Sequence, residues 1–130
     1  FAAAYATTPV CCPSRSTIHT GRHIHNVHVR NNSLAGNCGG ERWVREAEPH
    51  NVAHLLKQRA YATLFAGKYL NQYGNNEAAG ALRQVPRGWD EWYALRGNSV
   101  YYNYSMSVNG EPRAHGDAYP GDYLPLVVER

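Results

Sequence analysis

The order of two neighbouring segments constrains the fold of this 130-residue chain more than any other feature. Residues 49–58 carry Val52, Leu55 and Leu56 at the spacing of one helix face. Residues 61–65 follow almost at once and are rich in residues typical of a strand. Because a helix that leads directly into a strand is the alternation of α/β proteins, we expect an α/β sandwich.

Local signals predict further elements along the chain. Proline suits the first turn of a helix and glycine suits its end, so Pro13 and Gly21 predict a short helix over residues 13–20. Asn109-Gly110 is a strong hairpin turn signal. The remaining expectations are a strand or helix end over residues 1–10, loops over 22–40 and 71–86, a strand over 100–108 and a helix over 120–130.

Composition excludes several classes of protein. Hydrophobic residues make up 43% and charged ones 18%, which fits a folded domain. No stretch approaches the roughly 18 consecutive apolar residues of a membrane span. The balance of 13 Lys+Arg against 10 Asp+Glu is too even to indicate a nucleic-acid partner, and three cysteines are too few for a disulfide-stapled mini-domain. Because the chain starts at Phe1 without a Met and stops inside a predicted helix, we expect a fragment of a longer protein.

Residues 11–21 hold the densest chemistry. Cys11 and Cys12 stand at the start of the predicted helix, near unpaired backbone N–H groups and the positive end of the helix dipole. Arg15 adds a fixed positive charge about one turn further on. Such a position favours a reactive thiolate or a bound anion. The alternative reading of the same residues is a buried structural cysteine beside a helix-capping Ser/Arg pair, and the residues alone leave both open.

The exact string carries a resemblance. Cys11-Cys12-Pro13-Ser14-Arg15, followed after four residues by Thr20-Gly21, matches C-x-P-S-R-x(4)-T-G, which is similar to the first signature of the sulfatase family. The resemblance implies that a formylglycine-generating enzyme oxidises Cys11 to formylglycine, the catalytic aldehyde, during secretion. Cys12 then fills the variable position of the signature.

A second segment, residues 61–70, resembles the second sulfatase signature, which centres on Gly-Lys after a strand. The resemblance implies that Lys68 contacts the sulfate. Two positions depart from the pattern: Ala60 stands in place of the leading glycine, and Leu70 in place of the histidine that many sulfatases carry. The second departure removes a possible general acid.

The segment Gly67-Lys68-Tyr69-Leu70-Asn71, with Tyr73 following, resembles the branch of the family that acts on N-acetylglucosamine 6-sulfate. Further similar segments cover nearly the whole chain. The resemblance implies an α/β, alkaline-phosphatase-like fold, in which a mixed sheet is sandwiched by helices. Residues 1–130 would then be part of the N-terminal catalytic sulfatase domain, incomplete at both ends. The similar segments are His25-Asn26, Asn31-Asn32, Asn37-Cys38, Pro86 to Trp89, Trp92 to Leu95, Tyr101 to Tyr104, Val108 to Gly110 and His115-Gly116.

The implied reaction is hydrolysis of the 6-O-sulfate of N-acetylglucosamine units in a glycosaminoglycan such as heparan or keratan sulfate. One oxygen of hydrated formylglycine attacks sulfur and releases the alcohol, and the second hydroxyl then expels sulfate by re-forming the aldehyde. By resemblance Arg15 holds the formylglycine oxygen and Lys68 holds the sulfate oxygens. The implied cofactor is one Ca²⁺, to which Cys11 contributes as formylglycine while the other ligands lie outside these residues. The isolated chain is therefore expected to be inactive.

Other residues are also candidates for functional roles. By resemblance, His25 and Asn71 are candidates for substrate binding. Asn31-Asn32-Ser33 and Asn103-Tyr104-Ser105 are glycosylation sequons, which a lysosomal or extracellular sulfatase of the secretory pathway would use. Cys38 has no obvious partner, and we expect it to pair outside the chain or to remain a buried thiol.

Two clusters invite a binding-site reading that is disfavoured, and for the histidines the alternatives are, by resemblance, a loop beside the substrate pocket or simply solvated side chains. His23, His25 and His28 lie close together, but no cysteine pair or convincing fourth ligand accompanies them, so a zinc site is disfavoured. A run of aromatic residues could form a sugar-stacking platform, but core or loop anchors are the favoured reading. That run comprises Trp89, Trp92 and Tyr93.

Three other functions stay open. The chain could belong to a general arylsulfatase, or to a non-catalytic glycan-binding protein that never acquires the aldehyde. Intact Cys11, Pro13 and Arg15 disfavour the second, since by resemblance the modifying enzyme reads these residues. A phosphatase relative is disfavoured because such enzymes usually place Ser or Thr at the nucleophile position.

Overall fold

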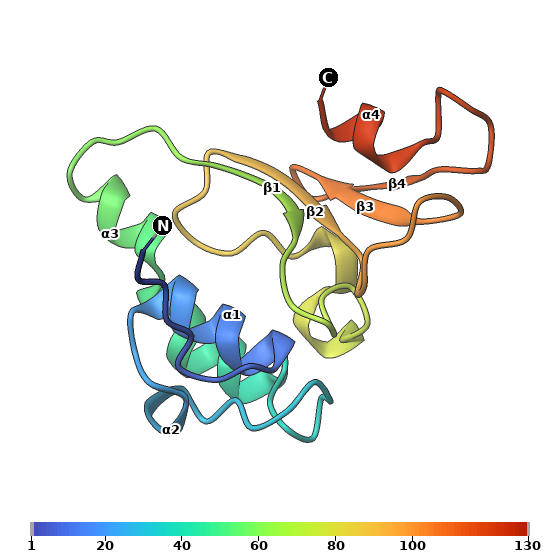
Figure 1. Ribbon diagram of the computed structural model, residues 1–130. Helices are drawn as coiled ribbons and strands as arrows, with labels where there is room; N and C mark the ends of the chain where they lie inside the picture. The colour runs from blue at the N-terminus through green and yellow to red at the C-terminus, as the bar shows by residue number, and fades with distance from the viewer. Residues whose placement is uncertain (1, 130) are drawn as a thin grey trace.

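The computed structural model describes residues 2–129, in which short helices are followed by a sheet and a last helix (Figure 1). Most of the helical elements precede Leu64, where the first strand begins. The elements are α1 (Cys11–Thr20), α2 (Ile24–Val27), the π-helical turn η1 (Trp43–Ala47), the 3₁₀ turn η2 (Glu48–His50), α3 (Val52–Lys57), β1 (Leu64–Lys68), the 3₁₀ turns η3 (Glu77–Ala79) and η4 (Ala81–Arg83), β2 (Glu91–Leu95), β3 (Ser105–Val108), β4 (Glu111–Ala114) and α4 (Leu124–Val128).

The four strands form one mixed sheet in the order β1-β2-β3-β4. β1 and β2 pair in parallel, whereas β2 with β3 and β3 with β4 pair antiparallel. Asn109 and Gly110 join β3 to β4 with φ of 51° and 86°, so the predicted hairpin turn is confirmed. The parallel pairing places Lys68 opposite Leu95, and the carboxyl ends of β1 and β2 therefore share one edge of the sheet.

Each face of the sheet packs against helices. Along β2, Trp92 and Ala94 belong to a core that includes residues of α1, α2 and η1. Tyr93 and Leu95 belong to a second core with Leu124 of α4. Because successive strand residues point to opposite faces, one strand feeds both cores. The helices lie on both sides of the sheet, so the expected α/β sandwich is confirmed (Figure 1).

Two predicted helices are confirmed with shifted ends. The helix predicted over 13–20 begins at Cys11, and Gly21 ends it with φ of 65° and an N–H that donates to the Thr17 carbonyl. The helix predicted over 49–58 is α3, which follows the turn η2. Asn51 caps α3 because its side chain accepts a hydrogen bond from the backbone N–H of His54.

Several local predictions are wrong. The strand predicted over 61–65 lies three residues later, as β1, and the one predicted over 100–108 begins only at β3. Strand β3 does not begin earlier because Asn103 has φ of 53° and its N–H donates to the Gly116 carbonyl. The predicted loop over 22–40 contains α2, and the predicted loop over 71–86 contains η3 and η4. The helix predicted over 120–130 is the shorter α4, and residues 2–10 hold no regular element. Phe1 and Arg130 lie outside the described residues.

Strand β2 is the element that sequence reasoning missed. Its Trp92 is fully buried and stacks on Phe65 of β1, with ring centroids 4.6 Å apart. Trp89 is half-buried and packs against the same core. The core reading of these aromatic residues is therefore confirmed over the sugar platform. Within residues 2–129, no helix reaches the length and apolarity that crossing a bilayer needs.

Gly88 gives a test of the packing between the segment before β2 and α3. Gly88 has φ of 97°, and a Cβ there would lie 2.2 Å from the His54 backbone nitrogen. In the whole protein we expect Gly88→Ala to lower the free energy of unfolding by about 3 kcal/mol or more, because strain and overpacking add. Gly21→Ala is the matched control, since φ there is 65° but a Cβ meets nothing within 4 Å. It should cost only about 1–2 kcal/mol. Equal losses in denaturant unfolding would contradict the packing account.

Candidate active site

The N-terminal turn of α1 lies against the carboxyl end of β1. Nη1 of Arg15 donates a hydrogen bond of 2.6 Å to the carbonyl of Lys68. This contact joins two segments that are 53 residues apart in sequence. Arg15 of the first signature segment and Lys68 of the second are therefore neighbours in the fold.

Lys68 carries an ammonium in a mixed environment. Burial lowers its pKa, the nearby Cys11 opposes this shift, and the Arg15 guanidinium adds to it. The side chain is half-buried, and its Nζ donates a hydrogen bond of 2.7 Å to Oδ1 of Asn98. One of its three donors is thus committed to the protein, and the others remain available for an anion.

Cys11 is the first residue of α1 and is an exposed, free cysteine. Its side chain lines a shallow hollow together with Arg15, Ser14 and residues of the segment before the helix. Cys11, Arg15 and Lys68, which sequence reasoning placed in one site, are therefore brought together. The exposed thiol is accessible to an enzyme or to a substrate.

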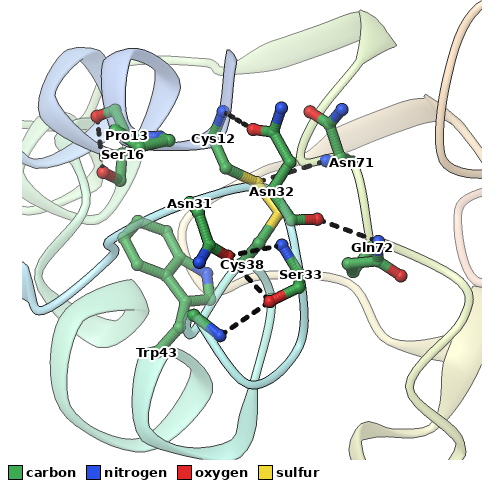
Figure 2. Close-up of a disulfide and its surroundings, with 12 residues drawn as sticks. Cys12, Pro13, Ser16, Asn31, Asn32, Ser33, Cys38, Trp43, Asn71 and Gln72 are labelled. Carbon is green, nitrogen blue, oxygen red and sulfur yellow. Dashed lines mark hydrogen bonds between the residues drawn. A yellow bond between two sulfur atoms is a disulfide. The ribbon is translucent and has the colours of Figure 1, made fainter. Parts of the chain in front are cut away.

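Cys12 forms a disulfide with Cys38, with 5.6 Å between their Cα atoms (Figure 2). The expectation that Cys38 pairs outside the chain or stays a thiol is therefore wrong. Neighbouring residues of a helix point in different directions, so Cys12 faces the core while Cys11 faces solvent. The signal that could have found the pair is this difference in direction between two adjacent cysteines.

Hydrogen bonds surround the disulfide and tie two loops, the one between α2 and η1 and the one after β1, to the start of α1 (Figure 2). The Cys12 N–H, which has no partner within the helix, donates to Oδ1 of Asn32. Nε2 of Gln72 donates to the Asn32 carbonyl at 2.9 Å, and the backbone N–H of Asn71 approaches the Cys12 sulfur at 3.4 Å. The position of Cys11 is therefore fixed by its neighbour rather than by its own contacts.

Asn71 is buried beside this network. Its Nδ2 donates a hydrogen bond of 2.9 Å to Oδ1 of Asn98, and its own Oδ1 has no partner among the described residues. Asn98 thus accepts from both Lys68 and Asn71. Sequence reasoning missed Asn98 because it lies in a loop outside any motif. Its position just after β2 was the available signal, but β2 itself was not predicted.

The remaining candidates lie at the surface. His25 of α2 is exposed and stacks on His23, with ring centroids 5.7 Å apart. That contact does not bring it to Cys11 or Lys68. Asn31 and Asn103 are exposed, as a glycan acceptor must be.

The family model described as Sulfatase matches residues 1–125. The chain belongs to the sulfatase family. It is 50% identical over 129 residues to the N-acetylglucosamine-6-sulfatases of Bos taurus and of Homo sapiens, which covers 98% of this chain and 23% of each relative. It is also 44% identical over 128 residues to the putative extracellular sulfatase Sulf-1 homolog of Caenorhabditis elegans, which covers 98% of this chain and 17% of that relative.

A solved structure shows the same fold. The structure of BT4656 in complex with its substrate D-glucosamine-2-N,6-O-disulfate superposes with a TM-score of 0.56 at 24% identity. The match covers 87% of this chain and 19% of that one. The sulfatase chain therefore spans about a quarter of the length of the relatives it matches, and its four-stranded mixed sheet is consistent with an alkaline-phosphatase-like fold.

The calcium ion implied by the sulfatase resemblance needs oxygen ligands. Over residues 2–129, no group of three or more His, Cys, Asp or Glu side chains is placed to hold a metal ion. The charged neighbours of Cys11 are the cations Arg15 and Lys68, which repel Ca²⁺. The residues present do not fit a calcium ion by themselves, and such an ion needs ligands from elsewhere in the protein.

A buried carboxyl group lies beneath the site. Glu48 accepts hydrogen bonds from Nε1 of Trp43 and the hydroxyl of Tyr69, both at 3.1 Å, and from the side-chain amide of Gln84. Burial raises the pKa of Glu48 to about 7, although these hydrogen bonds act in the opposite direction. Because Tyr69 follows Lys68, the carboxyl group is coupled to the end of β1.

The pH dependence of stability tests this carboxyl group. A folded-state pKa near 7 lies above the ordinary value of 4.5, so the stabilisation is complete below about pH 4.5 and is lost as the pH rises toward 7. In the whole protein, the stability difference between wild type and Glu48→Gln should therefore fall with rising pH in this window, by up to about 1.4 kcal/mol per pH unit. Glu41→Gln, which removes an exposed carboxyl group, is the matched control. A flat difference for Glu48→Gln, measured by urea unfolding, would contradict the raised pKa.

Proposed function

We propose that the protein containing this chain hydrolyses sulfate esters, and that its substrate is the 6-O-sulfate of N-acetylglucosamine units in glycosaminoglycans. The observation that supports this most directly is the contact between Arg15 and the Lys68 carbonyl, which joins the two signature segments beside Cys11. Membership of the sulfatase family and the names of the most similar relatives agree with it.

The charges of the cluster suit the reaction. A sulfate ester is an anion, and more negative charge develops on its leaving oxygen as the bond to sulfur breaks. Fixed cations that already face this charge lower the barrier without reorganisation. Lys68 offers free N–H donors for the sulfate oxygens, and Arg15 holds a second positive charge close by.

We propose that Cys11 is converted to formylglycine, whose hydrated form supplies the nucleophilic oxygen. Its exposure at the first position of α1 suits recognition by a modifying enzyme, and Arg15, one turn further on, is proposed to hold the new oxygen. We further propose one Ca²⁺, bound through formylglycine 11 and through ligands outside these residues.

Leu70 bears on which group can protonate the leaving alcohol. It stands where many sulfatases carry a histidine, and it is fully buried in the core below β1. A leucine can neither donate a proton nor, at this position, reach substrate. The alcohol must therefore take its proton from another group, which separates this site from relatives with the histidine.

The remaining proposals concern substrate and surroundings. Asn71, next to Lys68 in the fold, is proposed to bind substrate, and so is His25, although its exposed position on α2 gives it less support. We propose a secretory-pathway protein that acts in the lysosome or outside the cell. A general arylsulfatase and a non-catalytic glycan-binding protein are the alternatives.

Activity measurements on the whole protein test the reaction. Wild type should release sulfate from an N-acetylglucosamine 6-sulfate oligosaccharide faster than from an aryl sulfate, with little turnover of an aryl phosphate. Cys11→Ala should abolish turnover, and Lys68→Ala should lower kcat/KM by about 100-fold, the cost of one preorganised donor. Lys57→Ala is the matched control, because Lys57 pairs with Asp90 away from the site. Comparable turnover of phosphate, or activity that survives Cys11→Ala, would overturn the proposal. Binding of the sulfated sugar without turnover would favour the glycan-binding alternative.

Peptide mass spectrometry of the whole protein from its natural source tests the modifications. The peptide containing Cys11 should show the mass loss of thiol-to-aldehyde conversion, and the peptides containing Asn31 and Asn103 should carry N-glycans. Asn26, an exposed asparagine outside any sequon, is the unmodified control. Unmodified Cys11 at full occupancy would argue against the formylglycine mechanism. Bare Asn31 and Asn103 would argue against passage through the secretory pathway.

A further inference from the structure

Asn98 occupies the centre of the polar contacts at the carboxyl ends of the two parallel strands. Its Oδ1 accepts from Nζ of Lys68 at 2.7 Å and from Nδ2 of Asn71 at 2.9 Å. A carbonyl oxygen has two lone pairs, so these two bonds satisfy it fully. The two donors come from residues three apart, Lys68 at the end of β1 and Asn71 in the loop after it, whereas the acceptor comes from the loop after β2.

The backbone fixes where this oxygen lies. The N–H of Gly97 donates to the Tyr73 carbonyl at 2.9 Å, and the N–H of Arg96 donates to the Ser105 carbonyl at the same distance. These backbone bonds attach the loop after β2 to the loop after β1 and to β3. Gly97 also approaches closely, because a Cβ there would lie 3.3 Å from the Asn71 carbonyl. Asn98 is thus presented by a pinned backbone, although its own side chain is exposed.

The contact decides how Lys68 is held. A lysine ammonium sits on a flexible four-carbon stem and is otherwise free to choose among rotamers. A charge-assisted hydrogen bond to a fixed oxygen restricts it to one direction and leaves its other N–H donors pointing away from Asn98. The same oxygen sets the amide orientation of Asn71, since the opposite orientation would bring two oxygens together.

We infer that Asn98 is a positioning residue that aims the Lys68 ammonium and the Asn71 amide at the sulfate ester. The inference rests on the proposed function for its substrate, but not for its geometry. Asn98 acts through Lys68, so its effect should depend on Lys68 being present. A loss of activity caused by general loosening of the loop would not depend on whether Lys68 is present.

A double-mutant cycle on the whole protein tests this. We expect Asn98→Ala to lower kcat/KM for the 6-sulfated substrate about tenfold, the size of one charge-assisted hydrogen bond. With Lys68→Ala already present, adding Asn98→Ala should change kcat/KM by no more than about twofold, because interacting residues are not additive. Rates are divided by the fraction of position 11 present as formylglycine, so that poor conversion does not imitate lost positioning. Independent, multiplying losses from the two variants would overturn the inference.

Two further measurements keep the outcomes distinct. Asn75→Ala is the matched control: it removes another loop asparagine, which bonds Arg96 rather than Lys68, and should leave kcat/KM within about twofold of wild type. A tenfold loss there would show that loosening the loop is sufficient and would overturn the inference. The same cycle is measured in the Kd for N-acetylglucosamine 6-sulfate. If wild type shows no turnover while the two variants are coupled in Kd, the proposed function fails and the role of Asn98 stands; additive effects in Kd would overturn that role as well.

Discussion

The parallel pairing of β1 with β2 is the constraint on which the rest of the structure depends. It stacks Phe65 on Trp92 inside the first core and brings the two following loops to one edge of the sheet. In open α/β sheets this edge, at the carboxyl ends of the strands, is where ligands bind. Lys68 ends β1, and Asn98 follows the end of β2. Neither residue could take part in a common site if the strands were antiparallel.

Helix α1 completes the site by docking across this edge, and two kinds of bond hold it there. Arg15 bonds the carbonyl of Lys68, which leaves the lysine side chain free for other partners. The Cys12–Cys38 disulfide holds the helix N-terminus to the loop before η1. Because Cys12 is fixed in the core, its neighbour Cys11 is held at the surface without being buried itself. The two adjacent cysteines thus separate a buried anchor from an accessible thiol.

The sequence was sufficient to single out candidate site residues and insufficient to predict how they are arranged. Cys11, Arg15 and Lys68 stand in contiguous strings, so local order alone singled them out. The end of α1 at Gly21 and the turn at Asn109-Gly110 could also be predicted from the local sequence, because glycine and asparagine adopt positive φ at low cost.

The misses share a long-range origin. β2 was overlooked because Trp92 and Ala94 serve one core while Tyr93 and Leu95 serve the other, so the strand lacks the alternation of polar and apolar residues. The Cys12–Cys38 pair and the two bonds to Asn98 depend on how loops far apart in sequence meet. No short sequence pattern predicts such long-range contacts.

Two buried groups on either side of Tyr69 respond to pH in opposite directions. His19 of α1 packs edge-on against Tyr69 at 4.7 Å, and burial, with a smaller contribution from Arg15, lowers its pKa to about 4. Its stabilisation is therefore lost as the pH falls from 6.5 toward 4, whereas that of Glu48 is lost as the pH rises from 4.5 toward 7. Between about pH 4.5 and 6.5 the two slopes have opposite signs, so the contributions of His19 and Glu48 to stability offset each other there. Tyr69, which contacts both groups and follows Lys68, therefore sits between two pH responses that offset each other beneath the end of β1.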